Sequence, residues 1–233
     1  MSTANAIIVL CPNRPDLFGQ PLLGHVGWGF ELPDGQWMVA AVEGDQWVNG
    51  NRLNGFWSYR VPGLQQALQV FANMVHQGAE YNYYKFLTVT DQVWPDLDAA
   101  MHVMAWVSAQ RYELFGRNCM NSAYDVLRAF SRGGHFNGRV LPSPEHNWIP
   151  NGWFNAIQVP DHDFHYLPPA SHGVRAFALE PFEITVSPQC PDWRKPESPD
   201  YLPLTTAPSE PLQAVHVEPP TAQPADQLAE AED

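Results

Sequence analysis

Two strand-like segments flank a turn in GHVGWGFELPDGQWMVAAVEG, residues 24–44. The tripeptide Pro33-Asp34-Gly35 is a strong turn signal, so the two segments are predicted to pair as an antiparallel hairpin. If the loop is centred on Asp34, residues that face each other have numbers adding to about 68, which puts Glu43 opposite His25 on one face. A two-residue loop would shift this pairing by one residue and make the two side chains diagonal neighbours.

Strand and helix patterns continue on both sides of this hairpin. The apolar run at 6–11 predicts a buried strand, and residues 85–90 alternate in the manner of another strand. Helical spacing of apolar residues is found in three segments, 64–76, 96–110 and 120–130. Weaker strand signals are found in three later segments, 153–159, 174–178 and 182–186. We therefore predict a folded domain over residues 1–186 that contains both strands and helices.

The composition predicts a globular core followed by an acidic tail. Hydrophobic residues make up 45% and aromatic residues 12% of the 233-residue chain, which is long enough for one domain with a substantial core. The formal net charge is −13, and residues 187–233 hold nine Asp and Glu against two basic residues. Because phosphate contacts need clustered Lys and Arg, we expect no nucleic-acid partner.

Residues 187–233 are rich in proline and poor in large apolar side chains. Such a segment buries too little surface to offset its conformational entropy, so we predict a disordered tail with polyproline II character. This tail either keeps the protein soluble or docks a protein partner.

The three cysteines, Cys11, Cys119 and Cys190, form no C-x-x-C pair. A sparse, odd number argues against a disulfide scaffold and is typical of a reducing compartment. The apolar run at 6–11 is too short for a signal peptide or a membrane span, and no other targeting or transmembrane segment is evident. We therefore expect cytoplasmic synthesis, with export by a leaderless route left open.

Cys119 is the candidate nucleophile. Asn118 is predicted to cap a helix, which places Cys119 in the first helical turn. The positive end of a helix dipole favours a thiolate, and the N–H groups at a helix start can stabilise an oxyanion. The alternative is a buried apolar cysteine, which is the commonest state of a free cysteine and suits Cys11 and Cys190 better.

His25 is the candidate base for this thiol. It begins a strand that contains Gly27 and Gly29 and follows Gly24, and glycines in a strand often mark the close approach of a backbone or ligand. The alternative is an ordinary histidine at a strand start. Four other histidines lie on predicted helices or in loops and fit less well: His76, His102, His135 and His146.

Glu43 is the candidate third residue, which would hold the imidazole in position. The hairpin register places it beside His25, and it directly follows the apolar run 39–42, where an isolated carboxylate is unusual. Gln36 and Asp45 are weaker candidates for the same role. The alternative for Glu43 is a solvated strand end.

Metal-ligand residue types cluster in Asp161-His162-Asp163-Phe164-His165. No further ligand set is evident, and the stretch lies between two prolines, so a loop is favoured over a metal site. The nearby Asn147, Trp148, Asn151 and Trp153 either line a cleft or cover the core. We predict no metal and no cofactor.

The order of the site residues resembles that of a known family. An early His25 on a glycine-flanked strand, then a hairpin, a helix and Tyr112-x-x-x-x-x-Asn118-Cys119 at a helix start are similar to the circularly permuted NlpC/P60 group of papain-like proteins. That group includes lecithin:retinol acyltransferase-like and PPPDE-type members, and the resemblance covers roughly residues 20–132. It implies an α+β fold in which an antiparallel sheet packs against the helix that carries the nucleophile. The family's third polar residue follows the histidine on the neighbouring strand, as Glu43 does, although many members have histidine there.

The resemblance also implies attack on an amide, ester or thioester carbonyl through an acyl-enzyme. We therefore expect a cysteine hydrolase that acts on a peptide, amide or acyl substrate. In it Cys119 attacks the carbonyl, His25 transfers the proton and Glu43 holds the imidazole. Two alternatives use the same scaffold: an acyltransferase acting on a lipid or an amine, and a non-catalytic protein-binding module.

Overall fold

The structure is a computed structural model that describes residues 5–12, 23–44, 46–48, 51–76, 79–89, 95–114, 116–147, 149–160, 164–171 and 179–204. Within them an antiparallel seven-stranded sheet has the order β12-β9-β1-β2-β3-β6-β13. In that order the strands are His165–Tyr166, Tyr83–Thr88, Asn5–Cys11, His25–Glu31, Trp37–Val42, Phe56–Val61 and Glu180–Pro181. The fold is therefore α+β with an antiparallel sheet, as predicted.

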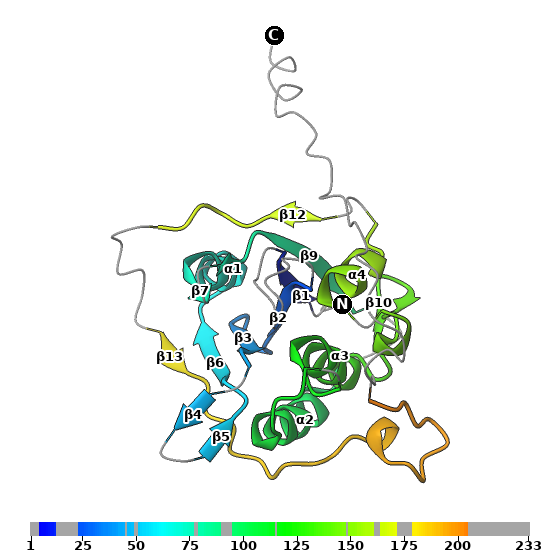
Figure 1. Cartoon of the computed structure of the whole chain (residues 1–233). Coiled ribbons are helices and arrows are strands. Elements are labelled where there is room, and N and C mark those ends of the chain that lie inside the picture. Colours follow the sequence, from blue (N-terminus) through cyan, green and yellow to red (C-terminus); the bar gives the residue numbers. More distant parts are fainter. Residues whose placement is uncertain are drawn as a thin grey trace.

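Helices cover both faces of the sheet (Figure 1). They are α1 (Leu64–Asn73), α2 (Leu97–Ala109), α3 (Cys119–Phe130) and α4 (Pro150–Ala156), with short 3-10 helices η1 (Pro144–His146) and η2 (Asp192–Arg194). Three small hairpins complete the described elements: β4–β5 (Gln46–Val48 and Asn51–Leu53), β7–β8 (Val75–His76 and Ala79–Glu80) and β10–β11 (His135–Phe136 and Arg139–Val140).

The central hairpin has the predicted register. Gly27 pairs with Ala41 and Trp28 with Ala40, and the turn is closed by Leu32 N–H donating to Gln36 O at 2.7 Å. Gly35 has a φ of 78°, a left-handed conformation that glycine adopts without strain. The prediction that the loop is centred on Asp34 is therefore confirmed.

Alternation along the strands separates two apolar clusters. One face of the sheet packs on α1, where a Cβ atom on Gly27 would lie only 2.5 Å from the Phe71 ring. The other face packs on α2, α3 and α4, and there Phe30 of β2 stacks on Phe130 of α3. Gly27 thus allows the close approach of a side chain, whereas a backbone or a ligand was expected there.

Three local predictions differ from the structure. Residues 153–159 do not form a strand, because Pro150 starts α4 and the buried Trp153 and Phe154 lie in this helix, which ends at Ala156. The helix predicted at 64–76 ends at Asn73, and residues 182–186 form no strand since β13 ends at Pro181. The segment 174–178 lies outside the described residues.

The predicted tail is packed over its first part. Residues 187–204 run along α2 and α3, where Arg194 is buried, while residues 205–233 lie outside the described residues. The proline-rich composition of this stretch did not indicate that Trp193 and Arg194 attach it to the folded domain. The boundary predicted at residue 187 is therefore not the end of packed structure.

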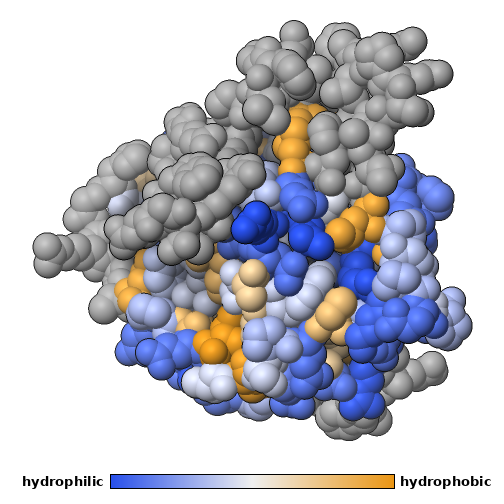
Figure 2. Space-filling model, turned by 60° about the horizontal axis from the view of Figure 1, so that its bottom comes forward, coloured by the Kyte–Doolittle hydropathy of each residue, from blue (hydrophilic) through white to orange (hydrophobic). Residues whose placement is uncertain are grey.

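Polar residues predominate on the face in Figure 2, where apolar residues form small separate groups. Among the described residues, no helix is long and apolar enough to cross a membrane.

Candidate active site

Cys119 is the first residue of α3. The Asn118 side chain caps the helix by accepting a hydrogen bond from Asn121 N–H at 3.0 Å, and Ser122 N–H donates to Asn118 O at 3.0 Å. The N–H groups that precede Ser122 lie at the positive end of the helix dipole. The predicted cap is confirmed, and Cys119 occupies the predicted first turn.

His25 is the first residue of β2 and is only 1% exposed. It pairs across the strands with Cys11 of β1, and Gly24 before it has a φ of 73°. A Cβ on Gly24 would lie 2.1 Å from Asn151 Oδ1, and Asn151 N–H donates to Leu23 O at 3.1 Å. The start of α4 therefore fixes the backbone that leads into His25.

Glu43 lies directly after β3 and is 5% exposed, so the alternative of a solvated strand end is wrong. Its Oε2 is 3.1 Å from His25 Nε2. Its Oε1 accepts hydrogen bonds from Trp57 Nε1 at 2.7 Å and from Tyr81 Oη at 3.2 Å. One carboxylate oxygen is thus held by two donors while the other faces the imidazole.

The charges around His25 favour its protonated form. Burial by itself lowers the pKa of His25, but the negative charge of Cys119, a hydrogen bond with Cys119, and a hydrogen bond and charge from Glu43 raise it to about 9. Burial, Glu43 and Cys119 together hold the pKa of Tyr81 well above its ordinary value, so Tyr81 stays a neutral donor. The arrangement suits a thiolate beside an imidazolium.

The Cys119 and His25 side chains approach each other from opposite sides of the sheet. Cys119 belongs to the apolar cluster on the α3 side, whereas His25 shares its side of β2 with Gly27, which faces α1. The two side chains therefore meet at the end of the sheet where β2 begins. Both are almost fully buried, with Cys119 2% exposed.

The structure thus brings together Cys119, His25 and Glu43. Gln36 lies in the hairpin turn at the far end of β2 and β3, and Asp45 lies outside the described residues. Cys11 is buried at the end of β1, while Cys190 is half-buried in the packed part of the tail. The catalytic roles of Cys119, His25 and Glu43 stay predictions.

No group of three or more His, Cys, Asp and Glu that could hold a metal is found among the described residues. Of the predicted cluster, residues 161–163 lie outside the described residues, and His165 stacks on Tyr84 between β12 and β9. Trp153 is fully buried and covers the core.

Trp57 and Tyr81 were not among the sequence candidates. The register could have indicated Trp57, because it faces Ala41, two residues before Glu43. Nothing local indicates Tyr81, which lies in the connection before β9 and contacts the site only through the fold. Its ring centroid is 5.7 Å from that of His25.

No family model, curated protein or solved structure matches the chain.

Proposed function

We propose that the protein is a cysteine hydrolase that cleaves an amide, peptide or ester bond through an acyl-enzyme on Cys119. The observation that carries the proposal is the buried set of Cys119, His25 and Glu43, in which the pKa of His25 is raised to about 9 by the thiol and the carboxylate. An imidazole held between a helix-start cysteine and a carboxylate is the arrangement that activates a thiol nucleophile.

The proposed reaction has two halves. The Cys119 thiolate adds to the substrate carbonyl carbon, and the N–H groups at the start of α3 stabilise the resulting oxyanion. The bond to the leaving group breaks as His25 donates its proton to that group, which leaves a thioester and a neutral imidazole. His25 then takes a proton from water, the hydroxide adds to the thioester, and release of the acid restores the thiolate and the imidazolium.

The order of the residues supports the permuted NlpC/P60 group of papain-like proteins as the scaffold. His25 precedes Cys119 in the chain, and the nucleophile begins a helix that packs on an antiparallel sheet. An acyltransferase would use the same first half and replace water with an amine or an alcohol. None of Cys11, Cys119 and Cys190 forms a disulfide, which agrees with a reducing compartment such as the cytoplasm.

A non-catalytic binding module is the second candidate, favoured by the burial of the site. Cys119 and His25 expose at most 2% of their surface, so a substrate can reach them only if the groups that cover them move. A purely structural thiol would need no such opening.

Acetylation by p-nitrophenyl acetate tests the proposal. We expect a rapid release of nitrophenol and one acetyl group on the peptide that carries Cys119, bound as a thioester that neutral hydroxylamine removes. Cys119→Ala and His25→Ala should abolish the reaction while the circular dichroism spectrum stays unchanged. The matched control is Cys190→Ser, which changes the half-buried thiol and should react like the wild type. Full activity in Cys119→Ala would show that the mechanism is wrong.

A further inference from the structure

The packed part of the tail, residues 187–204, forms a strap across α2 and α3. At its start Gln189 N–H donates to His102 O of α2 at 3.2 Å. Its end folds back on η2, where Leu202 N–H donates to Trp193 O at 2.7 Å. The strap is therefore attached to α2 and closed on itself around η2.

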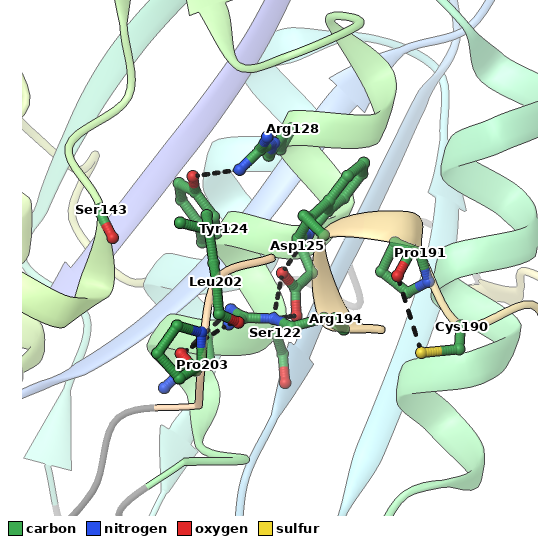
Figure 3. A network of polar contacts seen from close by, with 12 residues as sticks. Ser122, Tyr124, Asp125, Arg128, Ser143, Cys190, Pro191, Arg194, Leu202 and Pro203 are labelled. Atoms are coloured by element: carbon green, nitrogen blue, oxygen red, sulfur yellow. Dashed lines mark hydrogen bonds and ion pairs between the residues drawn. The ribbon is translucent and has the colours of Figure 1, made fainter. Parts of the chain in front are cut away.

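Arg194 joins this strap to α3 (Figure 3). Its Nε lies 3.0 Å from both carboxylate oxygens of Asp125, and Trp193 Nε1 donates to the same carboxylate at 2.8 Å. Its Nη1 donates to Leu202 O at 2.8 Å and to Pro203 O at 3.1 Å. Arg194 and Asp125 are both buried, and the partners of the guanidinium offset the cost of removing its charge from water.

The remaining nitrogen of Arg194 contacts the first turn of α3. Arg194 Nη2 donates to Asn121 Oδ1 at 3.3 Å. Asn121 Nδ2 in turn donates to Asn118 Oδ1 at 3.2 Å. Asn118 directly precedes Cys119, so a chain of two hydrogen bonds leads from the strap to the residue that caps the nucleophile helix.

This chain has a defined direction. A guanidinium can only donate hydrogen bonds, so it fixes which atom of the Asn121 amide is the oxygen and turns Nδ2 toward Asn118. Asn118 Nδ2 donates to Leu114 O at 2.8 Å, which fixes the other amide with its oxygen toward the helix. Each amide therefore has one orientation that satisfies its neighbours, and the cap is held from both sides.

We propose that Arg194 is a positioning residue for Cys119, acting through Asn121 and Asn118, so that the strap sets the reactivity of the thiol. The inference rests on the proposed function, in which Cys119 is the nucleophile. Loss of the Arg194 contact frees the Asn121 amide to turn, which loosens the cap and the first turn that carries the thiol. The C-terminal segment 187–204 is then a part of the reactive unit rather than an appendage.

A double-mutant cycle tests the coupling. Arg194→Lys keeps the charge opposite Asp125 but lacks the guanidinium nitrogen that reaches Asn121. Asn121→Ala leaves the ion pair intact. The third variant combines the two substitutions. The measurement is the iodoacetamide labelling rate of the Cys119 peptide as a function of pH. Each single variant should label about tenfold more slowly at neutral pH, with the pH midpoint shifted upward, and the double variant should label no more slowly than either. Lys195→Ala, which removes a neighbouring exposed cation, is the control and should leave the rate unchanged.

The proposal is overturned if Arg194→Lys labels like the wild type, or if the two effects multiply in the double variant. If Arg194→Lys does not fold, Asn121→Ala alone decides, and an unchanged pH midpoint there overturns the proposal.

Amide hydrogen exchange separates this inference from the proposed function. In Arg194→Lys the amides of Asn121 and Ser122 should exchange about tenfold faster than in the wild type, while those of residues 126–129 stay unchanged. A wild-type Cys119 that labels no faster than a free thiol would reject the proposed function alone. Unchanged exchange at Asn121 and Ser122 would reject the positioning role, whatever the reactivity of the thiol.

Discussion

Two buried charged clusters contact the helix α3, and they are built differently. The ion pair of Asp125 and Arg194 satisfies its donors and acceptors with protein groups. The cluster of His25, Glu43 and Cys119 instead contains a histidine whose pKa is raised to about 9 although burial alone would lower it. An arginine stays protonated throughout the accessible pH range, whereas a histidine between a thiol and a carboxylate can give up its proton.

The two clusters are therefore expected to have different roles. The Asp125–Arg194 pair joins the strap to the helix. The His25 cluster holds a proton beside a nucleophile and is connected to Asp125–Arg194 through the hydrogen bonds of Asn121 and Asn118. Stability should therefore depend most on the first cluster, and reactivity on the second.

The largest expected effect on stability is that of Arg194→Met. It leaves the Asp125 carboxylate buried and without its charge partner, which should lower the free energy of unfolding by about 3–5 kcal/mol. Urea unfolding followed by circular dichroism measures it. Lys195→Met, which removes an exposed ion pair with Asp192, should cost less than about 1 kcal/mol. Equal effects of the two variants would contradict the difference between a buried and an exposed cation.

The His25 proton should make stability depend on pH. Because the folded-state pKa of His25 is raised from 6.5 to about 9, its bound proton stabilises the fold fully below pH 6.5, and this contribution is lost as the pH rises through about 9. The free energy of unfolding should therefore fall as the pH rises through about 9. Urea unfolding on both sides of this pH measures the fall, and His25→Asn should remove most of the slope. An equal slope in both proteins would show that His25 does not hold the proton.

Glu43→Gln should act on reactivity more than on stability. The amide oxygen can still accept from Trp57 and Tyr81, but the charge that helps to raise the pKa of His25 is gone. The rate of acetylation by p-nitrophenyl acetate should fall about tenfold, and its alkaline midpoint should move to lower pH. Glu31→Gln on the same hairpin is the matched control. An unchanged midpoint in Glu43→Gln would remove Glu43 from the site.

Tyr81→Phe should give the smallest effect. It removes the 3.2 Å hydrogen bond to Glu43 and keeps the ring, while the Trp57 bond remains. We expect an acetylation rate about threefold to tenfold lower, which corresponds to the loss of one hydrogen bond. Tyr84→Phe changes a half-buried tyrosine of β9 and should have no effect on the rate. A larger loss in Tyr84→Phe than in Tyr81→Phe would contradict the site as described.

Local signals were sufficient to predict the two ends of the candidate site. A strong turn at Asp34 determined the register that brings Glu43 to His25, and an asparagine before a helical pattern indicated the cap of α3. These features depend on residues that are neighbours in the chain. The secondary structure of both segments was therefore predictable from sequence.

Several features that depend on long-range contacts were not predicted. The buried Trp153 and Phe154 suit a strand as well as a helix, and only packing against the sheet distinguishes the two. Arg194 pairs with Asp125, which lies 69 residues earlier in the chain. The composition of the tail therefore gave no indication of this ion pair. Tyr81 is 38 residues from Glu43 and is likewise invisible to local patterns.

The rate at which iodoacetamide labels Cys119 near neutral pH is the most direct measure of whether His25 activates this thiol. We predict that the Cys119 peptide is labelled much faster than a free thiol and that His25→Ala reduces the rate to that of a free thiol. A wild-type rate no faster than that of a free thiol, or a fast rate that survives His25→Ala, would contradict it.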